Sequence, residues 1–387
     1  MLKVGLIGCG HISETYFRSQ DYFNNINIVA CADINEDNAA TCARKYNVNK
    51  MAIDELFANK DIDIILNLTT PQAHFSTIKK TLVSGKHSYC EKPISTNYNE
   101  GNELLTLAKK NDLFLGNAPD TFLGGGSQLA RKIIDSNLIG EIKLGSINFS
   151  FPGVQSFHPN PDSWFQKGGG PVIDMGPYYF TSLVNLLGPA KNVRARPIKV
   201  QDFREIESGD RKGEKIKVEI PTTIIGSIEF INGAVIELFL SFDVINHKKN
   251  HIELYGTKGS IIVPDPNMFG GSVFTSKIEG GDWEEHSSSE MKLGKINIFN
   301  ESGRSNEAST NANYRGVGLS EMIDAIENNK TNRCNGELAL HVLDIIDSTI
   351  NAAIEGEEKD LRSTCIKPNI FSEEEIKILM KERKSSK

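Results

Sequence analysis

The feature that most constrains the fold is a glycine turn between a buried strand and a helix at the start of the chain. Residues 2–7 form a short apolar run, Gly8 and Gly10 follow, and the residues to about position 20 have helical spacing. Gly8 permits a tight turn, and Gly10 lets backbone N–H groups approach a pyrophosphate at the helix start. Ser13 stands where the dinucleotide fingerprint has glycine or alanine, so the motif alone is an imperfect match. The prediction of a dinucleotide site therefore rests on the strand–turn–helix context.

Strand-like and helix-like stretches continue to alternate to about residue 120. Strands are expected at residues 26–32, 62–68, 86–90 and 113–116, and helices at 36–46, 54–59, 72–84 and 98–110. This alternation is typical of a doubly wound parallel sheet, in which ligands bind at the carboxyl ends of the strands. We therefore expect an α/β fold whose residues 1–120 form a Rossmann dinucleotide-binding domain.

Several residues directly follow these strands and are predicted to contact the cofactor. Asp33 lies 25 residues after Gly8, where a carboxylate accepts hydrogen bonds from an adenosine ribose and repels a 2′-phosphate. Ile34 follows where an NADP enzyme often has a basic residue, so the pair favours NAD over NADP. His74 has the alternative of packing at a helix start. The predicted contacts are Gly8, Gly10, His11, Ile12, Asp33, Thr69, Thr70, Pro71, His74, Glu91, Lys92 and Asn117.

The sequence Glu91-Lys92-Pro93 ends one of these strands with a charge pair and a proline. Pro93 has no N–H and favours an extended backbone at Lys92, so the strand stops there. At the carboxyl end of a parallel strand, Lys92 would point a positive charge into the ligand crevice. An arbitrary lysine is far more often a surface residue, so this assignment depends on the surrounding alternation.

Beyond residue 120 the periodicity changes, and from about residue 192 to residue 275 the chain has strand signals without helices between them. Pro221 interrupts the first long run, which leaves two strands or one broken strand. The pattern predicts a second, α+β domain at 121–387 with a large, open, mostly antiparallel sheet. Its C-terminal helices can pack back on the first domain, and residues 276–313 are expected to be irregular. The expected strands are 142–151, 218–230, 234–242, 251–255 and 260–263, and the expected helices are 127–136, 171–187, 318–328, 337–354 and 372–383.

The helix expected at 171–187 carries a carboxylate and a phenol four residues apart. Asp174 and Tyr178 therefore share one helix face, and Pro177 should strain or kink the helix near them. Each residue also has a purely structural interpretation. Asp174 could stabilise the first turn of its helix, and Tyr178 could be a core tyrosine whose hydroxyl is hydrogen-bonded. Tyr179 is the alternative acid/base, but the four-residue spacing favours Tyr178.

Composition excludes several classes of function. The formal net charge is −7 and no basic stripe covers a face, so nucleic acid is not expected as a partner. No run of 18 apolar residues occurs, and no signal-peptide pattern opens the chain, so we expect neither a membrane span nor secretion. Six cysteines without a C-x-x-C pair fit a reducing cytoplasm. Aspartates and histidines do not fall at metal-ligand spacings, so we expect no catalytic metal.

The turn at residues 8–13, Glu91-Lys92-Pro93 and the Asp-x-Gly-x-Tyr sequence at 174–178, in this order, resemble the Gfo/Idh/MocA oxidoreductases. The resemblance implies an NAD-dependent enzyme that moves a hydride between nicotinamide and a secondary alcohol or ketone of a sugar, sugar derivative or cyclitol. It also implies an essential lysine at Lys92, whereas Tyr178 stands where histidine is commoner. An open sheet has a face to cover, so we expect a homodimer or homotetramer formed through it.

On this hypothesis Tyr178 removes the hydroxyl proton of the substrate. The Lys92 ammonium favours the phenolate and stabilises the developing alkoxide. Asp174 orients Lys92 or holds a substrate hydroxyl. Trp164 has the alternative of anchoring its loop, and Asp120 is a further candidate for binding hydroxyls. The predicted substrate contacts are Lys92, Asp120, His158, Trp164, Asp174 and Tyr178.

Two other functions stay open at this point. Tightly held NAD could oxidise a sugar transiently, so that a glycosidase or epimerase works without net redox change. The chain could also be a dinucleotide-binding sensor without catalysis, although such a protein has no need for Lys92, Asp174 and Tyr178.

Overall fold

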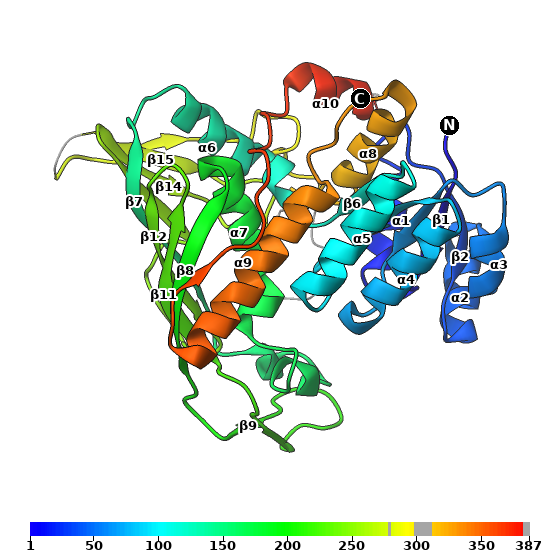
Figure 1. The fold of residues 1–387 in the computed structure, drawn as a ribbon, viewed down its shortest axis with the longest axis horizontal. Coiled ribbons are helices and arrows are strands. Elements are labelled where there is room, and N and C mark those ends of the chain that lie inside the picture. The colour runs from blue at the N-terminus through cyan, green and yellow to red at the C-terminus, as the bar shows by residue number, and fades with distance from the viewer. Residues whose placement is uncertain (278–279, 298–311, 382–387) are drawn as a thin grey trace. The chain divides into compact units, whose positions relative to one another are not determined.

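The computed structural model describes residues 1–277, 280–297 and 312–381 (Figure 1). The chain divides into two compact units, and it passes between them four times. The first break, after Gly124, lies close to the position expected from the sequence, but later segments return to the first unit. The first unit comprises Met1–Gly124, Asn297–Leu343 and Asn369–Lys387, and the second comprises Gly125–Ile296 and Asp344–Pro368.

The first unit contains a parallel sheet whose strand order is β3-β2-β1-β4-β5-β6. The order reverses between β1 and β4, as in doubly wound dinucleotide-binding folds, which confirms the predicted class. All of the strands except β3 are almost wholly buried, because helices cover both faces of such a sheet. The strands are β1 (Val4–Ile7), β2 (Ile28–Ala32), β3 (Asn49–Lys50), β4 (Ile64–Asn67), β5 (His87–Cys90) and β6 (Leu115–Asn117).

The helices of the first unit begin and end at local signals. The Asn35 side chain accepts the N–H groups of Asp37 and Asn38 at the start of α2, and Pro71 occupies the first position of α4. The helices are α1 (Ser13–Ser19), α2 (Glu36–Tyr46), α3 (Ile53–Ala58), α4 (Pro71–Val83), α5 (Tyr98–Lys110), η1 (Thr121–Leu123), α8 (Val317–Asn328), the first part of α9 (Gly336–Glu355) and α10 (Glu373–Leu379).

The second unit contains a nine-stranded sheet in the order β16-β15-β14-β13-β7-β12-β11-β8-β17. Its pairs are antiparallel except β7 with β12, so the prediction of a mostly antiparallel sheet is confirmed. The strands are β7 (Ile142–Ser150), β8 (Ala190–Ile198), β11 (Thr223–Phe230), β12 (Val235–Ser241), β13 (Ile252–Gly256), β14 (Gly259–Val263), β15 (Val273–Ser276), β16 (Glu284–His286) and β17 (Lys359–Asp360), with β9 (Phe203–Glu205) and β10 (Lys215–Lys217) as a separate pair.

Two of the sequence expectations are refined by these strands. Pro221 separates β10 from β11, so the run at 218–230 is a broken one rather than a continuous strand. The stretch expected to be irregular, 276–313, includes the short strand β16, while its residues 278–279 and 298–311 lie outside the described residues. The helix expected at 372–383 is shorter than predicted, because α10 ends at Leu379, and residues 382–383 lie outside the described residues.

One face of the second sheet is covered by α7 (Pro171–Leu187), which packs on β7, β11 and β12 (Figure 1). The helix runs through Pro177 without interruption. In β12 the side chains of Ile236, Leu238 and Leu240 are buried, whereas Val235 and Glu237 on the opposite face are exposed. In the part of the chain that the structure describes, the sheet is therefore covered on one face and open on the other. In the described part of the chain, no helix is both long and apolar enough to span a bilayer.

A buried arginine fastens α6 (Gly125–Asp135) to α7. Arg131 Nη1 donates to the carbonyl oxygens of Asn185 (2.6 Å) and Pro368 (2.7 Å), and its Nε donates to Asp135 (2.8 Å). Only 7% of Arg131 is exposed, so water cannot serve in its place as the hydrogen-bond donor to these carbonyl oxygens. The guanidinium thus helps to fix the helix that carries Asp174 and Tyr178.

We predict that Arg131→Met lowers the free energy of unfolding by about 2–5 kcal/mol, because two buried carbonyl oxygens lose their donor. Urea unfolding followed by tryptophan fluorescence measures this, since Trp164 and Trp283 both belong to the second unit. Arg18→Met is the control: Arg18 forms an exposed pair with Glu14, so its loss should cost less than about 1 kcal/mol. Equal effects of the two substitutions would contradict the role given to Arg131.

Candidate active site

The parallel sheet brings the predicted cofactor residues to one edge. Each strand runs in the same direction, so the residues that follow them share the carboxyl side of the sheet. Gly8 follows β1, Asp33 follows β2, Glu91 follows β5, and Asn117 ends β6. Of the remaining predicted contacts, His11 and Thr70 are exposed, and Ile12, Thr69 and Pro71 are half-buried.

The glycine turn has no room for a side chain at its first position. Gly8 has φ +100°, and a Cβ there would lie 2.5 Å from the carbonyl oxygen of Leu68. A Cβ on Gly10, in contrast, would meet no heavy atom within 4 Å. The backbone at Gly10 is therefore open to the close approach that a pyrophosphate requires, and the turn fits a dinucleotide.

Asp33 fastens this turn to the end of β2. One carboxylate oxygen accepts the N–H of Cys9 at 2.6 Å, and the other accepts the N–H of Asn35 at 2.7 Å. Each carboxylate oxygen can accept a further hydrogen bond, and Asp33 is only half-buried. The carboxylate can therefore bind ribose hydroxyls while it holds the turn.

His74 links the loops that follow β4 and β5. Its ring is 1% exposed, with Nδ1 2.6 Å from the carbonyl oxygen of Pro93 and Nε2 3.0 Å from that of Thr69. Burial lowers the pKa of the ring, and the two carbonyl oxygens oppose this shift. This geometry favours the packing alternative for His74, in which the ring positions the backbone beside Lys92.

The segment around Lys92 is held by side chains on both sides. The Tyr16 hydroxyl donates to Glu91 Oε1 at 2.8 Å, and the Lys92 N–H donates to Glu91 Oε2 at 3.1 Å. Burial, with Glu91 beside it, raises the pKa of Tyr16, so Tyr16 stays a neutral donor. Asn117 Nδ2 donates to the carbonyl oxygens of Cys90 and Glu91, both at 3.0 Å. Lys92 itself is half-buried at the end of this fixed strand.

Asp120 has a role in the fold rather than an open position for a substrate. It is 1% exposed, and its Oδ2 accepts the N–H groups of Gly316 (2.8 Å) and Gly318 (3.1 Å) at the start of α8. Burial raises the pKa of this carboxyl to about 6. The expectation from the sequence, that Asp120 binds substrate hydroxyls, has no support in this geometry, because the carboxylate caps a helix instead.

In the second unit, α7 presents Asp174 and Tyr178 one turn apart, and both are half-buried. Tyr179 differs: it is fully buried, and its hydroxyl lies 3.2 Å from the carbonyl oxygen of Asn148 and 2.8 Å from His251 Nδ1. Burial raises the pKa of Tyr179 well above its ordinary value. Tyr179 is therefore a core residue, which leaves Tyr178 as the candidate acid/base of this helix.

His158 and Trp164 lie together in the loop before α7. Their ring centroids are 4.8 Å apart, and Trp164 packs at the edge of a buried cluster that includes Phe165 and Phe242. Arg211 binds both carboxylate oxygens of Asp162 in the same loop. The loop is thus anchored at Trp164, while both aromatic rings keep partly exposed surface.

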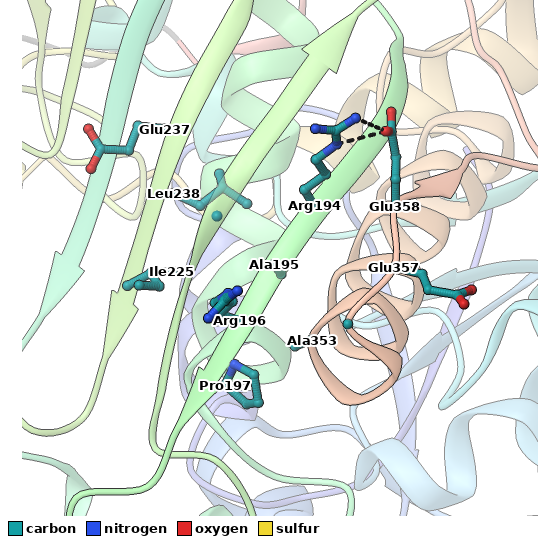
Figure 2. Close-up of a pocket in the computed structure, with 12 residues that line it drawn as sticks. Arg194, Ala195, Arg196, Pro197, Ile225, Glu237, Leu238, Ala353, Glu357 and Glu358 are labelled. Carbon is teal, nitrogen blue, oxygen red and sulfur yellow. Dashed lines mark hydrogen bonds and ion pairs between the residues drawn. The ribbon is translucent and has the colours of Figure 1, made fainter.

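A pocket of about 810 Å³ lies on the second unit, apart from all of these residues (Figure 2). Its labelled side chains come from β8, β11, β12, α9 and the short segment between α9 and β17, and Arg194 forms an ion pair with Glu358 in its lining. It opens on the exposed face of the nine-stranded sheet. No predicted site residue lines it, so we do not assign it to the reaction.

Sequence reasoning missed two residues that organise the edge. Tyr16 holds Glu91 from 75 positions away, and Asn67 accepts both the N–H (3.1 Å) and the hydroxyl (2.7 Å) of Thr69. A polar residue at the end of the apolar run 62–68 was the available signal for Asn67. Nothing in the sequence near Tyr16 indicates its distant partner.

Comparisons with known proteins match both parts of the chain. Residues 2–118 match the sequence model of an oxidoreductase family with an NAD-binding Rossmann fold, and residues 127–262 match a GFO/IDH/MocA C-terminal domain. The solved structure of levoglucosan dehydrogenase in complex with NADH has a TM-score of 0.77 and 19% identity, and covers 94% of this chain and 99% of that chain. At this identity the likeness shows the fold.

Curated relatives are matched over parts of their length. An uncharacterized oxidoreductase of Schizosaccharomyces pombe is 30% identical over 183 residues, which is 43% of this chain and 48% of the relative. The myo-inositol 2-dehydrogenase of Thermotoga maritima is 22% identical over 263 residues, which is 67% of this chain and 74% of the relative. The chain thus spans about half the length of the first of these relatives.

The raised pKa of Asp120 predicts a pH-dependent stability. The unfolded carboxyl titrates near its ordinary value of 3.8 and the folded one near 6, so between these values the folded protein keeps a proton that the unfolded chain has lost. Its contribution to stability is therefore present below about pH 4 and is lost as the pH rises to about 6. Asp120→Asn keeps an oxygen acceptor and cannot ionise, so it should not lose this contribution. From pH 4 to pH 7 the free energy of unfolding of the wild type should therefore fall by roughly 3 kcal/mol relative to that of Asp120→Asn.

Urea unfolding of both proteins across this pH range measures the difference. Asp120→Ala is the control: it leaves two buried N–H groups without an acceptor, so it should be about 1–3 kcal/mol less stable than Asp120→Asn at every pH. A stability difference between wild type and Asp120→Asn that is flat from pH 4 to pH 7 would show that this carboxyl titrates normally.

Proposed function

Because the chain belongs to the Gfo/Idh/MocA oxidoreductase family, we propose that it is an NAD-dependent dehydrogenase of a sugar, sugar derivative or cyclitol. It moves a hydride between the nicotinamide and a secondary alcohol or ketone. The observation that carries the proposal is the carboxyl edge of the parallel sheet, where Asp33 holds the Gly8–Gly10 turn and Lys92 ends β5.

The residues at this edge also favour NAD over NADP. The Asp33 carboxylate binds the hydroxyls of the adenosine ribose, and its negative charge repels a 2′-phosphate. The backbone at Gly10 receives the pyrophosphate, where no protein atom obstructs it. Bound NAD supplies the hydride acceptor, and the side chains of the protein supply the proton transfer and the charge stabilisation.

For the proton transfer we assign Tyr178 as the acid/base. It takes the hydroxyl proton as the alcohol is oxidised, and returns it in the reduction direction. The Lys92 ammonium stabilises the alkoxide that develops on the substrate. Asp174, one turn before Tyr178 on α7, orients the lysine or binds a hydroxyl. The buried and bonded hydroxyl of Tyr179 supports the choice of Tyr178.

The substrate class rests on the names of related proteins and on the aromatic loop. Two related proteins are named myo-inositol 2-dehydrogenase and levoglucosan dehydrogenase. Both names refer to ring alcohols as substrates. The partly exposed rings of His158 and Trp164 can stack on the apolar face of such a ring.

We also propose that the open face of the nine-stranded sheet binds a second copy of the chain. Leu144, Val235 and Tyr255 lie side by side on β7, β12 and β13, in register. Their exposed fractions are 58%, 40% and 39%, so they form an apolar row on the uncovered face. An exposed apolar patch can mark a protein–protein interface, and a two-fold symmetric dimer would bury this row against the same row of the second copy.

Tyr178→Phe should reduce kcat by about 10²–10⁴-fold, the usual contribution of a general base, with little change in NAD affinity. The matched control is Tyr179→Phe, which removes the same atom from the next residue and should keep most of the activity. Turnover is measured with a responsive ring alcohol, and NAD binding by fluorescence titration. Comparable losses in both variants would remove Tyr178 from the reaction.

Lys92→Ala should reduce kcat by roughly 10²–10³-fold while NAD binding is largely kept, because the lysine stabilises developing charge. If Lys92 and Tyr178 act on the same proton, the double variant Lys92→Ala/Tyr178→Phe should lose much less than the product of the two single losses. Loss of NAD binding with otherwise normal turnover at saturating NAD would contradict the catalytic role of Lys92.

Leu144→Asp should shift the protein toward the monomer, because a charge in the apolar row costs several kcal/mol when it is buried without a partner. Sedimentation velocity over a range of protein concentrations measures the change. Val83→Asp, which places the same charge on an exposed residue of α4, is the control. A wild-type protein that sediments as a monomer would contradict the proposed interface.

A further inference from the structure

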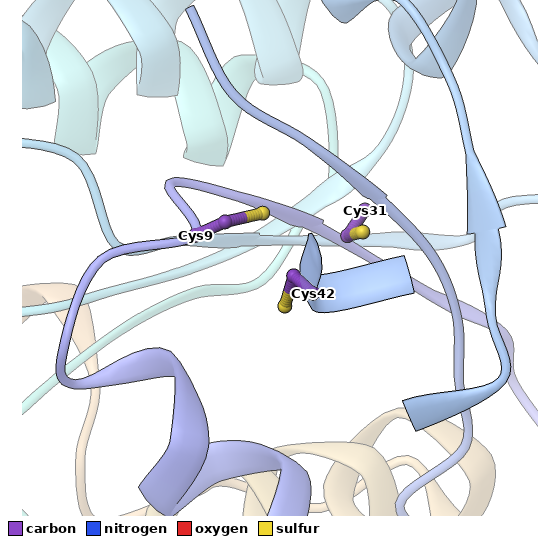
Figure 3. A group of neighbouring side chains, drawn as sticks. All are labelled: Cys9, Cys31 and Cys42. Atoms are coloured by element: carbon purple, nitrogen blue, oxygen red, sulfur yellow. The ribbon is translucent and has the colours of Figure 1, made fainter. Parts of the chain in front are cut away.

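Three cysteines from different elements of the first unit bring their sulfur atoms together (Figure 3). Cys9 lies in the glycine turn, Cys31 in β2 and Cys42 in α2, and the three sulfurs all lie within 4.8 Å of one another. Cys31 and Cys42 are buried and Cys9 is partly exposed. The proposed reaction uses none of these thiols. We call this group the three-cysteine cluster.

Two thiols of the cluster lie near backbone carbonyl oxygens of the same unit. Cys9 Sγ lies 3.6 Å from the carbonyl oxygen of Ala32, and Cys31 Sγ lies 3.6 Å from that of Ala39. None of the three forms a disulfide. Three sulfur ligands converge from a turn, a strand and a helix, so the fold itself creates the group.

The spacing of the sulfurs suits a metal ion better than a disulfide. Sulfurs bound to one tetrahedral Zn²⁺ lie about 3.8 Å apart, because each Zn–S bond is about 2.3 Å long. No pair of the cluster therefore has to close by more than about 1 Å, a change within the reach of small side-chain rotations. A disulfide needs a separation of about 2.05 Å and would engage only two of the three.

We propose that Cys9, Cys31 and Cys42 bind one thiophilic d¹⁰ cation, Zn²⁺ or its analogue Cd²⁺, with water as the fourth ligand. Binding is ligand exchange without oxidation: water leaves the cation, the three sulfurs bind as thiolates, and their protons pass to the solvent. The partly exposed Cys9 provides the route of entry. Because its three ligands lie in the glycine turn, β2 and α2, the ion would tie these elements together. The N–H of Cys9 is also bonded to Asp33.

The test is a titration of the full-length, reduced, chelator-treated protein with Cd²⁺ alone. We expect one equivalent to bind per chain, with the ultraviolet charge-transfer band of sulfur-to-cadmium bonds and a rise in Tm. Cys42→Ser and, separately, Cys31→Ser should each weaken this binding by at least about 10–100-fold, because loss of a ligand should cost no less than loss of a residue that orients one. Two variants at different elements guard against the failure of one to fold, which circular dichroism detects.

Cys365→Ser is the matched control, because Cys365 belongs to the second unit and lies outside the cluster. It should bind Cd²⁺ as the wild type does. The proposal fails if the wild type shows no stoichiometric charge-transfer band. It also fails if folded Cys42→Ser and Cys31→Ser both keep the band and the affinity, since the metal then binds elsewhere.

Discussion

The hydrogen bond from the Cys9 N–H to the Asp33 carboxylate is the contact on which the cofactor edge depends. At 2.6 Å it joins the turn after β1 to the end of β2, while Gly8 packs against the carbonyl of Leu68 before α4. His74 then joins the loops after β4 and β5. The edge is thus fixed by side chains that bind backbone atoms, so the turn at Gly10 can receive a cofactor without rearrangement.

In the second unit, buried hydrogen bonds likewise fix one helix, α7. Arg131 binds backbone carbonyl oxygens and so fixes α7, and the buried hydroxyl of Tyr179 is bonded to Asn148 and His251. These contacts set the rotation of α7 about its axis, and this rotation leaves Asp174 and Tyr178 half-buried on one face. Packing thus distinguishes two adjacent tyrosines that the sequence alone leaves as alternatives.

Local signals in the sequence predicted most of the helices and strands. The features that the sequence did not predict depend on contacts between distant residues. Asn35 starts α2 by accepting neighbouring N–H groups, and the fixed φ of Pro71 suits the first position of α4, so both helices were predictable. The contact of Asp120 with Gly316 spans 196 positions, and the parallel pairing of β7 with β12 depends on the whole sheet. The return of the C-terminal helices to the first unit was foreseen only as a possibility. Such features depend on tertiary packing, which single-sequence periodicity does not encode.

The central claim, that this fixed edge serves NAD-dependent oxidation of a ring alcohol, is tested most directly by one measurement. The purified protein is incubated with sugars, glycosides and inositols, with NAD and NADP in turn, and the reduced-nicotinamide absorbance is followed. The account predicts steady NADH formation with at least one ring alcohol and much slower reduction of NADP. Faster reduction of NADP would contradict the role of Asp33, and no reduced nucleotide with any substrate would contradict net dehydrogenation.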